Sequence, residues 1–350
     1  MWFYLGAILL IFFPWLLMKK DEVQIRNWLI YSWVILSLIE GLRAFHVGTD
    51  TSAYVRMFES QAFANYEIGY KWISIVIHSI STNASVYLLI LAALTNGLII
   101  WSIWKMSNNP NVSLFAYISL YYYFNSFNAV RQYIAVGFVL VAFVTLREKK
   151  YIKSGIAYLL AVSFHNTAVV GLLLIPIFIL TNWKEDTVSQ KNGILRKLKN
   201  LVIPILIFIA FQFVFGYLYD LFLRLFPQYA YYERTSSYLL QGTDAIQQKV
   251  LYSALLLLYV VLCDGEEWHL ILSFAVTLSF MLSYFRAMSR FLWYFDVFTI
   301  FAIADMWDTH VFTRQSLRIF RCVIILLLFA FLLYYLSAGV MRVTPYSFSF

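Results

Sequence analysis

The sequence predicts an all-α, polytopic integral membrane protein, and three observations carry this prediction. Hydrophobic residues make up 62% of the 350 positions, and charged residues only 13%. The mean hydropathy is +0.74, well above what a soluble domain of this length shows. The apolar runs are continuous rather than alternating, which favours helices, whose backbone groups pair internally in lipid, over a β-barrel. Polar stretches are short, so we expect a single transmembrane domain over residues 1–350.

About twelve apolar runs are candidates for membrane spans. A full span needs about 20 apolar residues, and fewer suffice where a helix is buried in the bundle. The predicted spans are 2–18, 27–41, 84–104, 112–127, 131–146, 154–164, 166–182, 200–217, 248–263, 269–284, 291–307 and 318–338.

Clusters of Lys and Arg set the predicted orientation, because cytoplasmic loops carry an excess of these residues. An even number of spans must then separate the four basic loops, which puts both termini outside. This requires residues 69–82 to lie at or re-enter the outer surface, and 154–182 to form a hairpin that turns at His165. The net charge of +8 reflects these loops rather than a nucleic-acid partner. The clusters are Lys19, Lys20 and Arg26; Arg147, Lys149, Lys150 and Lys153; Lys184, Lys191, Arg196, Lys197 and Lys199; and Arg314, Arg318 and Arg321.

The same orientation gathers the unusual polar residues on the outer side. Two outer-face loops are expected, near 42–83 and 218–247, and the second is long enough to form part of an acceptor-binding surface. A charged side chain inside or beside a membrane span is costly and marks a functional site by default. Five short segments meet this description.

The first two segments lie in the loop 42–83. Arg43 follows a predicted span, and Asp50 ends a Gly-Thr-Asp turn, where it is either a base, a partner of Arg43 or a simple helix cap. Glu67 enters the next apolar stretch, where low dielectric on one side would raise its pKa into a range useful for proton transfer. A plain interfacial glutamate is the alternative for Glu67.

The third segment is Tyr121–Gln132, with three tyrosines and two asparagines before Arg131. Tyrosine faces stack on sugars, amides hydrogen-bond to hydroxyl groups, and a guanidinium binds phosphate oxygens in pairs. An aromatic belt explains the tyrosines without a site, and snorkelling explains an interfacial Arg131.

The fourth and fifth segments contain His165 and a pair of arginines. His165 lies in a polar turn between two short apolar runs and could move protons at neutral pH, although a lone histidine is also a common structural residue. Arg286 and Arg290 are four positions apart and share a helical face, with Asp296 as a possible counter-ion. Helix-end anchoring is the structural alternative for both arginines.

Several other kinds of chemistry lack support in the sequence. There is no phosphate-binding glycine loop, zinc motif or Gly-x-Ser-x-Gly nucleophile elbow. Cys263 and Cys322 lie at the ends of apolar runs without disulfide or metal spacing, which is typical of core thiols. Hydrolase chemistry at the membrane is therefore not indicated.

Taken together, four of these motifs resemble the EpsG family of Wzy-like polysaccharide polymerases. The resemblance covers roughly residues 40–175, and the C-terminal half is similar only in character. The motifs are Arg43 with Val47-Gly48-Thr49-Asp50 and Tyr54; Glu67-Ile68-Gly69-Tyr70; Phe127-Asn128-Ala129-Val130-Arg131-Gln132; and Ala161-Val162-Ser163-Phe164-His165-Asn166-Thr167.

This resemblance implies an enzyme of the bacterial inner membrane that polymerises undecaprenyl-diphosphate-linked oligosaccharides at the outer face, for capsule, exopolysaccharide or O-antigen. The growing glycan would pass to the non-reducing end of the next unit. The implied fold is of the glycosyltransferase C type, without a metal or other cofactor, and a chain-length regulator is a possible partner. A flippase for the same lipid-linked substrate and a glycan ligase are the alternatives.

The chemistry of this reaction suggests roles for the residues singled out above. Arginines would stabilise the charge that develops on the leaving diphosphate, and a base or orienting group would act on the acceptor hydroxyl. We expect the diphosphate ligands to be Arg131, Arg286 and Arg290, with Arg43 as a weaker member; the base to be His165, then Glu67, then Asp50; and the sugar ligands to be Gln132, Tyr123 and Asn128.

Overall fold

The computed structural model describes residues 1–183, 243–263, 266–281 and 288–349, with a few single positions between 202 and 224. These residues form helices and connections, and no β-strand occurs among them. The prediction of an all-α protein is therefore confirmed for the described part. The chain divides into two compact units, one made of Met1–Val169 with Ile303–Phe350 and the other of Val170–Ala302. A single transmembrane domain stays a prediction.

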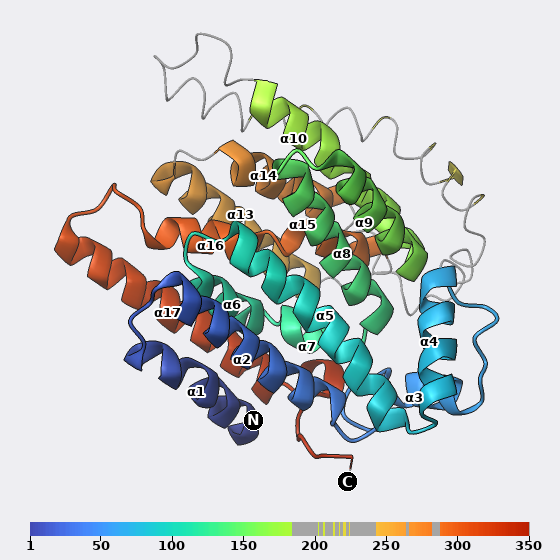
Figure 1. Cartoon of the computed structure of the whole chain (residues 1–350). Coiled ribbons are helices and arrows are strands. Elements are labelled where there is room, and N and C mark those ends of the chain that lie inside the picture. Colours follow the sequence, from blue (N-terminus) through green and yellow to red (C-terminus); the bar gives the residue numbers. More distant parts are fainter. Residues whose placement is uncertain are drawn as a thin grey trace. The chain divides into compact units, whose positions relative to one another are not determined.

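The first unit is a helical bundle with α5 at its centre (Figure 1). Helix α5 packs against both α2 and α8, and α8 in turn packs against α9. The helices of this unit are α1 (Trp2–Leu17), α2 (Glu22–Gly41), α3 (Thr51–Glu59), α4 (Ile68–Ile80), α5 (Ala84–Met106), α6 (Pro110–Ser119), α7 (Tyr122–Ser126), α8 (Val130–Arg147), α9 (Tyr151–Phe164), α17 (Arg314–Ser337) and the short η6 (Val340–Arg342).

Local signals in the sequence explain several helix starts. The Asp21 side chain accepts a hydrogen bond from the Gln24 amide at the start of α2, and Asn83 caps α5 in the same way. Pro110 stands in the first turn of α6, where its missing N–H costs nothing. Asp50 occupies the N-cap position of α3, but its side chain makes no capping hydrogen bond.

The span predicted over 112–127 is divided into α6 and α7. Tyr121, between them, has a φ of 71°, a left-handed conformation that ends a helix. Its hydroxyl donates to the Val340 carbonyl at 3.0 Å. A contact with a residue so distant in the chain leaves no local pattern, so the break was not predicted.

Polar contacts separate the first unit into two ends. At one end the Tyr4 hydroxyl donates to the Val343 carbonyl at 2.8 Å, and the Gly48 amide donates to the Arg342 carbonyl at 2.8 Å. At the other end Arg321 donates to Asp308 at 2.7 Å. The basic residues after α1, at the end of α8 and along the start of α17 all belong to this second end, and its cytoplasmic orientation stays a prediction.

Residues 340–349, after α17, form a segment that runs along the first loop, and no sequence pattern indicated it. The Ala44 amide donates to the Ser347 carbonyl at 2.8 Å, and the Ser349 amide donates to the Leu42 carbonyl at 2.9 Å. The Tyr346 hydroxyl donates to the Ile39 carbonyl at 2.9 Å. Two parts of the chain that lie far apart in sequence therefore share one end of the unit.

The second unit contains fewer described elements. Helix α14 packs against α10, α13 and α15. The elements are α10 (Leu174–Trp183), α13 (Thr243–Leu262), α14 (Glu266–Met281), η5 (Met288–Leu292) and α15 (Trp293–Asp296), with η1 (Asn166–Leu173) and α16 (Thr299–Trp307) crossing the boundaries of the unit. The predicted span 200–217 and most of the predicted loop 218–247 lie outside the described residues, and positions 243–247 belong to α13 rather than to a loop.

Three described helices are long and apolar enough to cross a membrane: α5, α8 and α17. Shorter apolar helices, among them α1 and α9, run to at most 17 residues. Helix α4 has 13 residues, short of the about 20 that a full span needs, which agrees with the prediction that residues 69–82 do not cross. The described part thus supports a membrane protein with fewer full-length spans than the twelve predicted.

Candidate functional site

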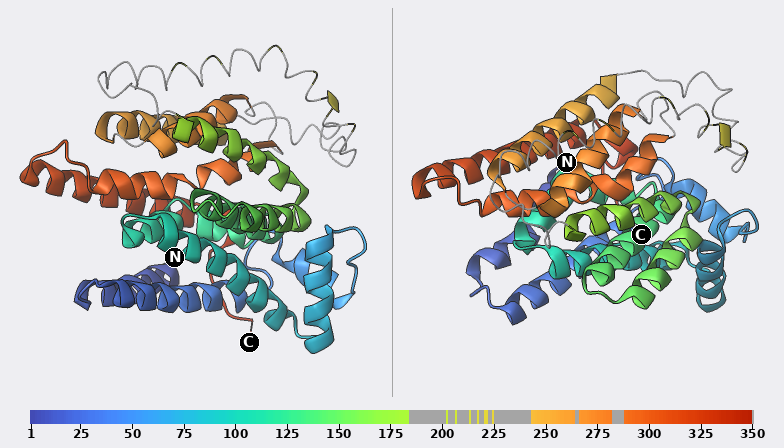
Figure 2. Two further views of the ribbon diagram at one scale, coloured as in Figure 1. Left: turned by 45° about the horizontal axis from the view of Figure 1, so that its top comes forward. Right: turned by 90° about the horizontal axis from the view of Figure 1, so that it is seen from above.

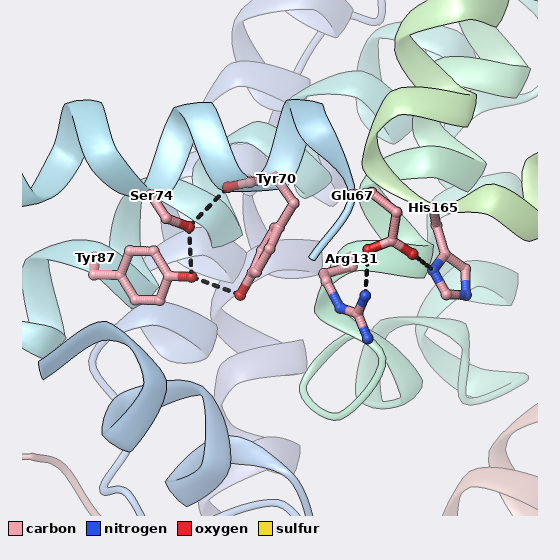
Figure 3. A network of polar contacts seen from close by, with 6 residues as sticks. All are labelled: Glu67, Tyr70, Ser74, Tyr87, Arg131 and His165. Carbon is pink, nitrogen blue, oxygen red and sulfur yellow. Dashed lines mark hydrogen bonds and ion pairs between the residues drawn. The ribbon is translucent and has the colours of Figure 1, made fainter. Parts of the chain in front are cut away.

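Glu67 joins two of the predicted site residues to each other. Its Oε1 lies 2.8 Å from His165 Nδ1, and its Oε2 forms an ion pair with Arg131 Nη1 (Figure 3). In the sequence, Arg131 lies 64 positions after Glu67, and His165 lies 98 positions after Glu67. We call Glu67, Arg131 and His165 the charged cluster.

Helix termini position all three side chains. Glu67 is the N-cap residue of α4, Arg131 is the second residue of α8, and His165 follows the last residue of α9. The Tyr158 hydroxyl donates to the Val169 carbonyl at 2.8 Å, so the chain turns back at His165, as predicted. Side chains at helix ends are held by rigid elements yet stay near the surface of the bundle.

A glycine allows α4 to approach α9 at this point. A Cβ at Gly69 would lie 2.3 Å from Ser163 Oγ and 3.0 Å from the Ser163 carbonyl oxygen. Real Cβ atoms essentially never lie 2.3 Å from a neighbouring atom, so a larger residue would require Ser163 or the helices to shift. Gly69 therefore sets the spacing that brings Glu67 to His165.

The charged cluster is partly open. The exposed fraction of the side chain is 25% for Arg131, 13% for His165 and 9% for Glu67. Burial alone would raise the pKa of Glu67, but the hydrogen bond from His165 and the charge of Arg131 outweigh it and lower this pKa to about 2. The expectation of a raised pKa is therefore wrong: two partners that the local sequence does not reveal keep Glu67 ionised.

Tyrosines surround the guanidinium of Arg131. The Arg131 Cζ atom lies 4.8 Å from the ring centroid of Tyr66 and 5.7 Å from that of Tyr70. Behind Tyr70, the Tyr87 hydroxyl donates to the Tyr70 hydroxyl at 2.5 Å and lies 3.1 Å from Ser74 Oγ (Figure 3). Sequence reasoning assigned no role to Tyr66 or Tyr70, although tyrosines one position before and three after Glu67 are a usable signal.

Arg43 lies in a second cluster that is fully buried. Its Nη2 donates to the Phe127 carbonyl at 2.8 Å, its Nε donates to Thr51 Oγ1 at 3.2 Å, and its Nη1 donates to the Glu40 carbonyl. The Glu40 carboxylate accepts from Asn96 Nδ2 at 2.6 Å and from Ser126 Oγ at 2.9 Å. The hydrogen-bonding groups of this cluster are already bonded to partners within the protein, so the contacts favour a structural role for Arg43. Its binding of diphosphate stays a prediction.

The predicted sugar ligands also make internal contacts. Asn128 Oδ1 accepts from the backbone amides of Thr49 and Asp50, and Asn128 Nδ2 donates to the Met341 carbonyl at 3.3 Å. The Tyr123 hydroxyl donates to the Leu36 carbonyl at 2.8 Å, and Gln132 is buried. These contacts hold the loop near Asp50 in place. Sugar binding by these residues stays a prediction, as does a role for Asp50 as the base.

The remaining predicted residues belong to the second unit. Arg290 is exposed in η5, with its Cζ atom 6.0 Å from the Trp293 ring centroid, and Asp296 is buried in α15. Arg286 lies outside the described residues. Convergence of these arginines with Arg131 stays a prediction. Among the described residues, no group of three or more His, Cys, Asp or Glu side chains could hold a metal ion.

Comparison with known proteins defines the class to which this bundle and its charged cluster belong. The model of the EpsG family matches residues 26–348, nearly the whole chain. The chain therefore belongs to the EpsG family, a family of Wzy-like polysaccharide polymerases and exopolysaccharide biosynthesis proteins. The match confirms the resemblance over residues 40–175 and extends it through the C-terminal half. Searches of curated proteins and of solved structures found no match.

Proposed function

We propose that the protein polymerises undecaprenyl-diphosphate-linked oligosaccharide units at the outer face of the bacterial inner membrane. The growing glycan is transferred to the non-reducing end of the next unit. Membership of the EpsG family supports the class of reaction. The single observation that carries the assignment of the site is Glu67 bound to both Arg131 and His165. The proposal includes a glycosyltransferase C type of fold with about twelve spans.

Arg131 is suited to the leaving diphosphate. A guanidinium has five N–H donors, and the ion pair with Glu67 engages Nη1. Nε is buried, but the remaining terminal N–H groups can bind phosphate oxygens on the open side of the charged cluster, since a quarter of the side chain is exposed. Tyr66 and Tyr70 limit the directions in which the guanidinium can turn. Negative charge that forms on the diphosphate then meets a donor that is already in position.

His165 is suited to accept the proton of the acceptor hydroxyl. Since Glu67 is ionised, Nδ1 of a neutral His165 carries the proton of their hydrogen bond, and Nε2, on the opposite side of the ring, has the lone pair (Figure 3). The acceptor oxygen forms a bond to the anomeric carbon of the donor sugar while its proton moves to Nε2. The bond between that carbon and the phosphate oxygen breaks, and the diphosphate keeps the electron pair.

The orientation of the first unit supports an outward-facing site. The basic residues of Lys19–Arg26, Arg147–Lys153 and Arg314–Arg321 belong to the end of the bundle opposite the charged cluster. Such residues accumulate on the cytoplasmic side, which supports an outer location for the charged cluster, where lipid-linked units would arrive after transport across the membrane.

The first experiment deletes the gene in its host and labels the lipid-linked oligosaccharides, with complementation by Arg131→Ala. We expect single repeat units that are accessible from outside, no long polymer, and no rescue by Arg131→Ala. The matched control is Arg321→Ala, which removes an arginine of the same unit from its ion pair with Asp308 and should restore polymer. Repeat units trapped on the cytoplasmic side would indicate a flippase. Normal polymer that is not attached to its final acceptor would indicate a ligase.

A further inference from the structure

Helix α4 has one apolar face that no other part of the described structure covers. Ile68, Trp72, Val76 and Ile80 follow one another at intervals of four residues, with exposed fractions of 65%, 60%, 51% and 77%. Residues four apart lie on one face of a helix, so these side chains form a continuous stripe along the whole helix. We call these four residues the apolar stripe. Helix α4 stands at the edge of the first unit in Figure 1 and in both views of Figure 2.

The opposite face of α4 is packed. Tyr70, Ser74 and Ile77 are buried there, and Ser74 and Tyr70 belong to the hydroxyl chain with Tyr87. Helix α4 is thus fixed in rotation by its inner face, and the apolar stripe cannot turn inward. In a membrane protein an outward apolar face commonly contacts lipid hydrocarbon. The apolar stripe of α4 differs from other such faces in its position, because it begins beside the charged cluster.

The apolar stripe starts next to the charged cluster. Ile68 directly follows Glu67, whose carboxylate holds Arg131 and His165. From there the stripe extends for about 18 Å, given a rise of about 1.5 Å per residue. A cation at one end of a long apolar strip complements a ligand with an anionic head and an apolar chain.

We propose that the apolar stripe of α4 binds the isoprenoid chain of the lipid carrier while Arg131 binds its diphosphate. This inference rests on the proposed function, because that function supplies a carrier with a diphosphate head. The order of the ligand along the helix follows from the structure: the diphosphate lies at the N-terminal end of α4, and the chain runs toward Ile80.

The physical contribution of the stripe is alignment rather than hydrophobic transfer. Lipid tails are as apolar as the side chains of the stripe, so the free energy of binding comes from van der Waals packing of the chain along the stripe rather than from hydrophobic transfer. Contact along several residues does fix the direction of the chain, and hence the direction in which the diphosphate leaves. Preference for a long isoprenoid over a short one is the property that the stripe should control.

The test measures this preference directly. Radiolabelled undecaprenyl diphosphate is bound to the full-length protein in vesicles of phosphatidylglycerol and phosphatidylethanolamine, and geranyl diphosphate and unlabelled undecaprenyl diphosphate compete with it. We expect the preference for the long chain to fall on the order of ten-fold in the variant Trp72→Ser with Val76→Ser, the range that loss of a few apolar contacts produces. Binding of geranyl diphosphate should stay unchanged, because Arg131 is intact.

The matched control is Leu326→Ser with Leu327→Ser on α17. These residues are 66% and 64% exposed on another apolar helix, and their replacement should leave the preference unchanged. An equal fall in the control, or an equal loss of both ligands in the α4 variant, would show that the stripe only faces bulk lipid and would overturn the proposal.

A second measurement does not depend on polymerisation or on serine variants. A photoreactive benzophenone side chain at position 72 should cross-link undecaprenyl diphosphate more than bulk phospholipid, and the same group at position 326 should not. Cross-linking of phospholipid alone at position 72 would contradict the proposal. Specific cross-linking by a protein that makes no polymer would keep the site for the chain but refute the proposed reaction.

Discussion

The first unit contains two glutamate–arginine clusters that differ in how their charges are used. Glu67 and Arg131 meet side chain to side chain, with His165 on the same carboxylate, and parts of them reach the surface. Glu40 and Arg43 are fully buried; Arg43 binds carbonyl oxygens and Thr51, while neutral donors from Asn96 and Ser126 serve the Glu40 carboxylate. The same pair of residue types is open to a ligand in one place and closed in the other.

This difference shows what makes an arginine available for binding. In the buried cluster, each polar group of Arg43 has a partner within the protein, and exchanging it for a ligand would leave other buried groups unsatisfied. In the open cluster, Glu67 fixes Arg131 through one nitrogen and the tyrosine rings fix its plane. An arginine can thus be held in a fixed position without being available to a ligand. Of these two arginines, only Arg131 is both fixed and available.

The largest expected effect on stability comes from Arg43→Ala. The Phe127 and Glu40 carbonyl oxygens and the Thr51 hydroxyl would lose their donor, and each buried unsatisfied group costs about 1–3 kcal/mol. We expect little protein in the membrane and a strongly lowered melting temperature in detergent, in contrast to Arg131→Ala. A stable Arg43→Ala protein that makes no polymer would instead place Arg43 in the site.

His165→Gln and Glu67→Gln should separate the roles within the charged cluster. General base catalysis contributes about 10²–10⁴-fold, so His165→Gln should lower the rate by at least about 10²-fold. Glu67→Gln should lower it less and change its dependence on pH, because His165 loses the negative charge that favours its protonated form. Rates are measured with purified lipid-linked units at constant protein level. Identical pH profiles for wild type and Glu67→Gln would argue against coupling of the two residues.

A smaller effect is expected from Gly69→Ala, which tests the close approach of α4 and α9. The new Cβ would overlap with Ser163, so α4 should shift and Glu67 should lose its alignment with His165. We expect reduced polymerisation with normal protein level. The double variant Gly69→Ala with Ser163→Gly removes the overlapping side chain and should recover part of the activity. No recovery would mean that the backbone of Ser163, rather than its side chain, sets the limit.

The smallest predicted effect concerns stability at low pH. The pKa of Glu67 is about 2 in the folded protein against an ordinary value of 4.5, so ionised Glu67 stabilises the fold fully above pH 4.5. This contribution decreases as the pH falls from 4.5 through 2. The difference in melting temperature between wild type and Glu67→Gln should therefore shrink over that range.

The sequence was sufficient to select the members of the charged cluster but not to join them. Arg131, Glu67 and His165 each stand out as polar residues beside an apolar run, and the hairpin turn at His165 was also predictable. Arg43 stands in a similar local setting, so nothing local separates the open arginine from the closed one. That distinction depends on partners such as Phe127, 84 positions away.

Glu40 and the break at Tyr121 show two different reasons for a missed feature. Glu40 lies inside a predicted span, and its cost in a membrane was a usable signal. The left-handed Tyr121 gave no such signal, because its hydroxyl bonds to Val340, 219 positions away. Helices follow from local periodicity, whereas breaks that depend on distant partners do not.

The segment 340–349 has a consequence for the order of assembly during synthesis. Its contacts with the first loop join residues such as Ile39 and Tyr346, which are 307 positions apart. Closing so large a loop is entropically costly. It also happens late in synthesis, because the helices between Ile39 and Tyr346 must insert first. The ribosome has therefore made and released most of the bundle before the loop that carries Arg43 acquires these partners. The newly inserted protein should pass through a state with its helices in place and with the segment 340–349 not yet joined to the first loop.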